Sequence, residues 1–137
     1  MRWFKSRKAQ VIVVCRHWDD AREAVLDIRG GAEEEEDRLS MHLIASDGHD
    51  VVCVGRLRMG SAVSRAGRRQ CRLSGVETAG LGSAGHRTAI VNAAARIARG
   101  ARSELVDGHG RRFESERVAI QVSSRSGRFT SPAPVAL

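Results

Sequence analysis

Hydrophobic residues divide the first half of the chain into a strand, a helix and a hairpin. Residues 10–15 form a continuous, β-branched run, which is typical of a buried strand. From Asp19 to Ile28 apolar residues recur at helical spacing, with aspartates at the start and two glycines after the end. Residues 39–46 and 51–57 alternate on either side of Asp47-Gly48, which predicts two strands joined by a tight turn.

The second half of the chain predicts a loop, a strand and a longer helix. Residues 60–67 are small and polar and predict either a loop or a shortened strand, whereas residues 70–76 alternate as a strand does. A glycine-rich connection, residues 80–87, leads into a helix over residues 88–99 whose apolar side chains share one face. Two short strands are predicted after this helix, at residues 104–106 and 117–122. Strands interleaved with helices predict an α/β domain.

The length and composition predict one hydrophobic core. The chain has 137 residues, of which 42% are hydrophobic, 28% charged and 4% aromatic, and it contains no tyrosine. This size is that of a single domain, and its core has to be built from aliphatic side chains. We expect a basic N-terminal segment over residues 1–9, a single domain over residues 10–122 and a flexible tail over residues 123–137.

No segment predicts a membrane span or a disulfide framework. The longest apolar run, residues 11–15, is far shorter than the about 20 residues that a spanning helix needs. The basic start lacks a signal-peptide cleavage pattern, so we expect a cytoplasmic protein. Three cysteines lie far apart in apolar stretches, which favours buried free thiols over metal ligands, and no metal site is expected.

The charge pattern leaves two interpretations open. The net charge of +7 comes almost entirely from arginine, and a solvated basic surface is the simpler explanation. The alternative is nucleic-acid binding by six arginines in a stretch without acids: Arg56, Arg58, Arg65, Arg68, Arg69 and Arg72. The acidic block at residues 33–37 predicts an exposed, self-repelling loop, which is usually only solvated but could attract a cationic amine.

A strand, a glycine-rich turn and a helix follow one another around residues 76–91. In this order the backbone N–H groups of the first helical turn, aided by the helix dipole, can surround a phosphate. On spacing alone a purely structural turn is the simpler interpretation. The sequence contains no Gly-Lys-Ser/Thr triplet and no early strand followed by spaced glycines, which excludes a Walker loop and a dinucleotide fold.

Residues 76–91 resemble the coenzyme-A-binding segment of the GNAT superfamily of N-acetyltransferases. In that family a strand ending in Val-x-Pro is followed by an Arg/Gln-x-x-Gly-x-Gly/Ala turn and a helix that opens with Ala-Leu-Val. The hairpin over residues 42–57 resembles the family's central hairpin, and residues 113–120 resemble its Phe-Tyr-Glu-Arg-x-Gly-Phe ending. The resemblance implies an α/β (α+β) fold with a mixed, mostly antiparallel central sheet flanked by helices.

The resemblance also implies a reaction and its residues. An amine would attack the thioester of acetyl-CoA directly, while backbone amides polarise the carbonyl. Glu77 would be the general base, and Ser115 would return a proton to the thiolate. The acceptor would be a small-molecule or peptide amine. The protein could also assemble as a homodimer. The implied coenzyme-binding residues are Val76, Gly82, Ser83, Gly85, His86, Arg87 and Thr88.

The sequence departs from the family pattern at three places, which keeps an alternative open. Thr78 stands where proline is usual, Leu81 or Gly82 stands where Arg/Gln is expected, and Glu114-Ser115 replaces the position of the tyrosine. A catalytically inactive acetyltransferase-like domain is therefore the alternative to an active enzyme. In that case Glu77 and Ser115 are exposed polar residues without a catalytic role.

Overall fold

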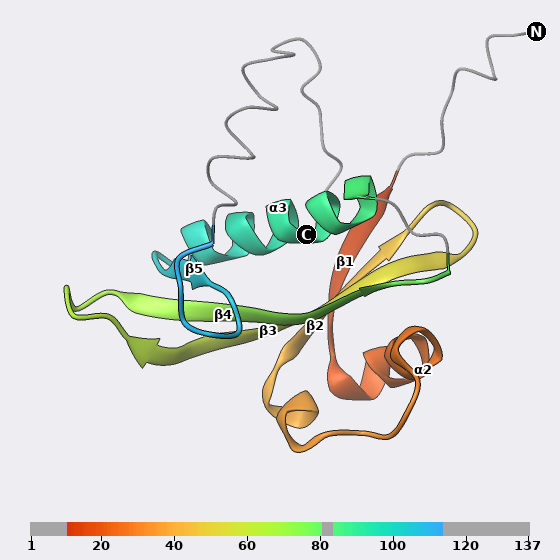
Figure 1. Ribbon diagram of the computed structural model, residues 1–137, viewed down its shortest axis with the longest axis horizontal. Coiled ribbons are helices and arrows are strands. Elements are labelled where there is room, and N and C mark those ends of the chain that lie inside the picture. Colours follow the sequence, from red (N-terminus) through yellow and green to blue (C-terminus); the bar gives the residue numbers. More distant parts are fainter. Residues whose placement is uncertain (1–10, 81–83, 114–137) are drawn as a thin grey trace, which may run out of the picture.

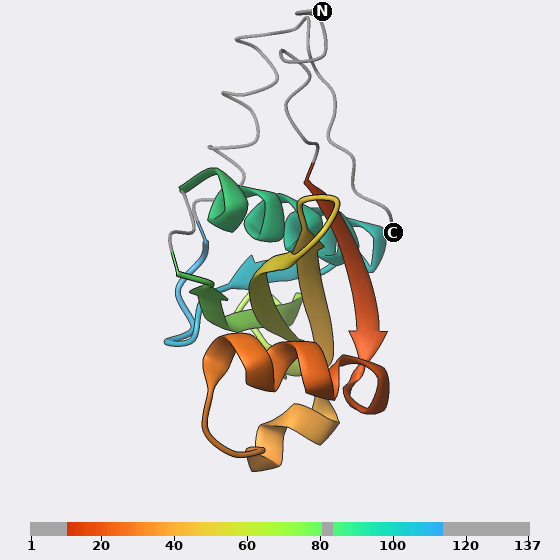
Figure 2. The ribbon, with the colours of Figure 1, turned by 90° about the vertical axis from the view of Figure 1, so that its right-hand side faces the viewer.

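A five-stranded sheet carries one helix on each face (Figures 1 and 2). The computed structural model describes residues 11–80 and 84–113. Strands β1 to β4 pair antiparallel in chain order, and β5 pairs parallel with β4. The predicted fold, a mixed and mostly antiparallel sheet flanked by helices, is confirmed. The elements are β1 (Ile12–His17), α2 (Trp18–Arg29), η1 (Glu35–Leu39), β2 (Met41–Ser46), β3 (Val51–Val63), β4 (Arg69–Thr78), α3 (Ala84–Gly100) and β5 (Glu104–Val106).

The two faces of the sheet hold separate hydrophobic clusters, as the alternation along the strands requires. On one face Leu43 and Leu57 pack with the alanine-rich side of α3. On the other face Ile44 and Val54 pack with Trp18 and its neighbours on α2. Because both faces are covered, the interior strand β2 is buried at four consecutive positions, residues 42–45.

Gly55 lets α3 lie close to the sheet. A Cβ atom at this position would stand 2.8 Å from Cγ2 of Ile90 and 3.3 Å from Cδ1 of Leu73. The first distance is well below van der Waals contact, so only glycine fits here unless the side chain of Ile90 or the helix that carries it shifts. Ile90 is fully buried, and its contact with β3 sets the height of α3 above the sheet.

Several predicted boundaries are confirmed, and the structure decides between the two alternatives for residues 60–67. The first strand, the first helix and the hairpin lie within a few residues of their predicted positions, and α3 begins at Ala84, ahead of residue 88. Of the two alternatives for residues 60–67, the first half is strand, because β3 continues to Val63. Gly60 has φ +53, and the register shifts between Arg58 and Ala62, so the strand passes this point as an irregularity. The strand predicted at residues 117–122 lies outside the described residues.

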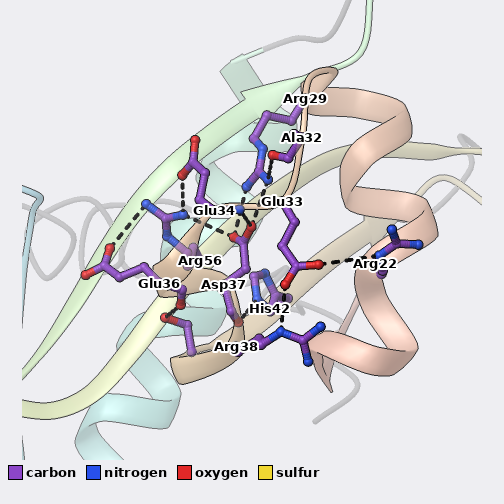
Figure 3. A network of polar contacts seen from close by, with 11 residues as sticks. Arg22, Arg29, Ala32, Glu33, Glu34, Glu36, Asp37, Arg38, His42 and Arg56 are labelled. Atoms are coloured by element: carbon purple, nitrogen blue, oxygen red, sulfur yellow. Dashed lines mark hydrogen bonds and ion pairs between the residues drawn. The ribbon is translucent and has the colours of Figure 1, made fainter.

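The acidic block is ordered, so the prediction of an exposed, self-repelling loop is wrong. Asp37 is fully buried in η1, and its carboxylate accepts two hydrogen bonds from Arg29 at 3.0 and 2.9 Å (Figure 3). It accepts two more, from Arg56 at 3.1 Å and from the backbone N–H of Glu34 at 2.6 Å. Burial alone would raise the pKa of Asp37, but these hydrogen bonds hold the pKa well below its usual range. Arginines from α2 and β3 thus neutralise the block.

The described cysteines are free thiols, as predicted. Cys53 and Cys71 are buried in the cluster beneath α3, and Cys15 is half-buried. Burial raises the pKa of Cys53 to about 11, although Arg87 acts in the opposite direction. In the part of the chain that the structure describes, no helix is long and apolar enough to cross a membrane.

Candidate functional site

The connection between β4 and α3 begins at a fixed point at the end of the sheet. Thr78, the last residue of β4, lies opposite Cys53 on β3. The N–H of Ala79 donates a 2.9 Å hydrogen bond to the carbonyl oxygen of Val52, and Gly80 follows with φ +39. The helix then starts at Ala84. Two of the predicted phosphate residues, Gly82 and Ser83, lie outside the described residues.

The first turn of α3 has the composition of an anion site. It contains no acidic side chain, and Ala84, Gly85 and Arg87 are exposed while His86 and Thr88 are half-buried. The first N–H groups of a helix have no partner within the helix, and the helix dipole makes this end positive. Four of the predicted coenzyme residues, from Gly85 to Thr88, therefore share one exposed, electropositive helix end.

Strand β4 continues past the end of its partner β5. The two strands pair only from Gln70 to Arg72, opposite Glu104 to Val106, whereas β4 runs on to Thr78. Among residues 11–80 and 84–113, none forms a strand against this edge of β4 beyond Arg72. The backbone N–H and C=O groups on this edge can therefore bind an extended ligand. The end of β4 and the first turn of α3 lie on the same side of the domain (Figure 1).

A bulge at Gly75 places Val76 and Glu77 on opposite faces of the sheet. The register jumps from Ser74 opposite Arg56 to Glu77 opposite Val54, and Gly75 has φ +59. Val76 packs against the cluster beneath α3, so its backbone is what it offers a ligand. Glu77 is exposed on the face that α2 covers.

Glu77 lies within electrostatic reach of Arg29 at the end of α2. The predicted general base is thus accessible to solvent and stands three residues before Gly80. Ser115, the predicted proton donor, lies outside the described residues. Within the described part, no group of three or more His, Cys, Asp or Glu side chains could hold a metal ion.

The predicted basic stretch is interrupted by ion pairs. Arg56 contacts Glu34 at 2.8 Å and Glu36 at 3.3 Å in addition to Asp37 (Figure 3). Arg58 contacts Glu36 at 3.2 Å. These two members of the stretch therefore neutralise the acidic block. Of the other four arginines, Arg65 and Arg68 lie in the turn between β3 and β4, Arg69 begins β4, and Arg72 lies directly opposite Arg58.

A pocket of about 360 Å³ lies at the C-terminal end of α3, away from the candidate coenzyme site. Its walls include Arg68 from the β3–β4 turn, Arg99 and Arg102 from the end of α3, and Arg112 and Phe113 after β5. The sequence analysis missed this pocket, because its residues come from separate segments. The high arginine content was the only sequence signal that pointed toward it.

Comparison with known proteins supports the fold. Neither the sequence profiles of known families nor the sequences of curated proteins match this chain. A ribosomal-protein-alanine N-acetyltransferase from Brucella melitensis biovar Abortus 2308 is similar in structure, with 15% identity, a TM-score of 0.53 and coverage of 90% of this chain and 95% of its own. An aminoglycoside N-acetyltransferase in complex with CoA has 10% identity, a TM-score of 0.53 and coverage of 88% and 90%.

A transcriptional regulator from Bacillus halodurans C-125 is also similar, with 14% identity, a TM-score of 0.52 and coverage of 88% and 95%. The similar structures are mostly acetyltransferases, and at these identities the similarity concerns the fold. This agrees with the resemblance found in the sequence. The chain therefore has the fold of the GNAT-type N-acetyltransferases.

Proposed function

We propose that this protein is an acetyl-CoA-dependent N-acetyltransferase. The observation that carries the proposal is the junction of β4 and α3, where an uncovered strand edge meets an exposed helix N-terminus without acidic residues. An extended thiol ligand with a pyrophosphate at one end matches these two features. A protein of similar fold has been solved in complex with CoA.

Different residues of the junction would bind different parts of the coenzyme. The N–H groups of the first α3 turn would hold the pyrophosphate, with the side chains of His86, Arg87 and Thr88 around it and Gly85 allowing close approach. The uncovered edge of β4 would align the extended arm of the coenzyme and direct a backbone N–H toward the carbonyl oxygen of the acetyl group. When bound, acetyl-CoA supplies the thioester that an amine attacks.

Glu77 would accept the proton that the attacking amine loses, directly or through a water molecule. It is exposed at the end of β4 and can therefore reach a substrate that lies along this edge. Ser115 remains the proposed donor of a proton to the departing thiolate. Glu35, exposed in the acidic block, adds negative charge on the face of Glu77 and would favour a cationic amine.

The acceptor belongs to the class of small-molecule or peptide amines. The proteins of similar fold carry both kinds of name, one for ribosomal-protein alanine and one for aminoglycosides. A cytoplasmic location is part of the proposal, because free buried thiols such as Cys53 are typical of a reducing compartment.

The test is release of free CoA thiol from acetyl-CoA by the purified full chain. Aminoglycosides and peptides that begin with alanine serve as the amine panel. We expect turnover with at least one class, a fall in kcat of about 10²-fold to 10⁴-fold in Glu77→Gln, and unchanged kcat in the matched control Asp50→Asn, an exposed acid in the β2–β3 turn. Arg87→Ala should raise the KM for acetyl-CoA. Absence of thiol release with every amine, despite measurable binding of acetyl-CoA, would leave the inactive domain as the correct account.

A further inference from the structure

The pocket at the C-terminal end of α3 concentrates positive charge over an apolar floor. Arg68, Arg99, Arg102 and Arg112 reach it from three separate parts of the chain, and Glu104 is the one acidic residue among those that line it. Its volume of about 360 Å³ lies in the range of small-molecule sites. The arrangement therefore suits a ligand that is both anionic and partly apolar.

The backbone of Arg102 is held in an unfavourable conformation at this pocket. Arg102 has φ +53, the one positive φ among the described residues other than glycine. It occupies the left-handed position of a Schellman motif, since the N–H of Ser103 donates to the carbonyl oxygen of Ala98 at 2.8 Å and the N–H of Arg102 donates to that of Arg99 at 3.0 Å. Glycine adopts this conformation without cost, whereas arginine does not. Such strain is typical of residues retained for function.

Apolar side chains form another part of the pocket wall. Ala98 and Leu105 are buried, and Phe113 stands half-buried beside them. The N–H of Phe113 donates a 3.0 Å hydrogen bond to the carbonyl oxygen of Leu105. Arg112 pairs with Val106 as an antiparallel bridge, so the segment after β5 is fixed against that strand. The backbone of Phe113 is thus fixed against β5, which places its side chain at the wall of the pocket.

Stabilisation of the helix end does not explain the whole cluster. Arginines near a helix C-terminus interact favourably with the helix dipole, which accounts for Arg99. Arg68 and Arg112 lie outside α3, and Arg102 occupies a position where glycine would stabilise the helix end better.

We propose that this pocket binds a small organic phosphate that carries a planar aromatic ring, with the ring against Phe113 and the phosphate among the arginines. Guanidinium groups bind phosphate through paired, charge-assisted hydrogen bonds, and several of them together select a phosphate over a neutral molecule. The pocket and the first turn of α3 lie at opposite ends of a 17-residue helix, roughly 25 Å apart at 1.5 Å per residue. The proposal therefore stands independently of the coenzyme site.

The test titrates the ¹⁵N-labelled full chain with adenosine monophosphate and follows the amide resonances by NMR. We expect shifts at Ser103, Leu105 and Phe113, and weaker binding of both adenosine and inorganic phosphate than of the intact nucleotide. Arg102→Gly should weaken binding about tenfold while raising Tm by about 3–5 °C, because the variant loses one phosphate contact and relieves the strained backbone. Arg96→Ala, an exposed arginine of α3 that does not line the pocket, is the matched charge control and should leave the affinity unchanged.

Three results would overturn the proposal. One is an affinity for adenosine monophosphate that Arg102→Gly leaves unchanged. Another is a set of shifts confined to Gly85–Arg87 at the other end of α3, which would assign the nucleotide to the coenzyme site. The third is an oligonucleotide that binds far more tightly, with an affinity that falls steeply with added salt, because this would identify a nucleic-acid surface and not a small-molecule pocket.

Discussion

Replacement of Asp37 by asparagine tests the role of the buried ion-pair network. Each carboxylate oxygen of Asp37 accepts two hydrogen bonds, one oxygen from Arg29 and Arg56 and the other from Arg29 and the N–H of Glu34. An asparagine side chain has the same shape, but its NH₂ group can only donate. Whichever way the amide turns, two of the four hydrogen bonds are lost and donors face donors.

The loss of stability expected for Asp37→Asn follows from the burial of Asp37 and of its partners Arg29 and Arg56. Asp37 is fully buried, and the side chains of Arg29 and Arg56 are only 12% and 16% exposed. Removing one member of a buried ion pair leaves uncompensated charge, which costs about 3–5 kcal/mol. This is a large part of the roughly 5–15 kcal/mol by which small domains are stable. Glu35→Gln, which neutralises an exposed acid of the same helix, should cost less than about 0.5 kcal/mol.

The free energy of unfolding of both variants is measured by urea unfolding, followed by far-UV circular dichroism. An unchanged slope of this free energy against urea concentration checks that unfolding stays two-state. The wild-type protein should also lose stability as the pH falls below about 4. At that pH Asp37 becomes protonated in the unfolded state but stays ionised in the folded state. Asp37→Asn should lack this part of the pH dependence. A cost below about 1 kcal/mol for Asp37→Asn, or equal costs for the two variants, would refute the account of the network.

Three further predictions concern other parts of the core. Burial lowers the pKa of His42 from 6.5, so the free energy of unfolding should fall as the pH drops from 7 to 5.5, and His42→Gln should flatten this slope in urea titrations at a series of pH values. Gly55→Ala should cost about 1–3 kcal/mol in the same assay, and the double variant with Ile90→Ala should cost less than the two single variants together. Cys53 and Cys71 should not react with Ellman's reagent until the protein is unfolded; rapid reaction in buffer would contradict their burial.

The local pattern of hydrophobic positions was sufficient to predict β2, the first part of β3 and the buried side of α3. The alternation on either side of Asp47-Gly48 predicts β2 and β3, and the apolar stripe through Ile90 and Ala94 predicts the side of α3 that meets the sheet. The turn is closed by Asp47 itself, whose carboxylate accepts hydrogen bonds from the N–H groups of His49 and Asp50. In these segments neighbouring residues alone determine the structure.

Contacts between distant residues explain what the pattern could not predict. Glu34 and Asp37 meet Arg56, which follows about 20 positions later, and this partner converts a repelling run into an ordered turn. The bulge at Gly75 changes the face on which Glu77 lies, because one extra residue reverses the alternation of a strand. The pocket at the end of α3 likewise forms only when three segments come together.

The central claim is that the junction of β4 and α3 binds acetyl-CoA. The most direct measurement is a thermal melt of the purified full chain with and without acetyl-CoA, because a ligand that binds the native state alone stabilises it by mass action. We expect a rise in Tm that increases with ligand concentration and is reduced in Arg87→Ala. A cooperative melt whose midpoint does not move at millimolar acetyl-CoA would contradict the claim and leave an acetyltransferase fold without coenzyme binding.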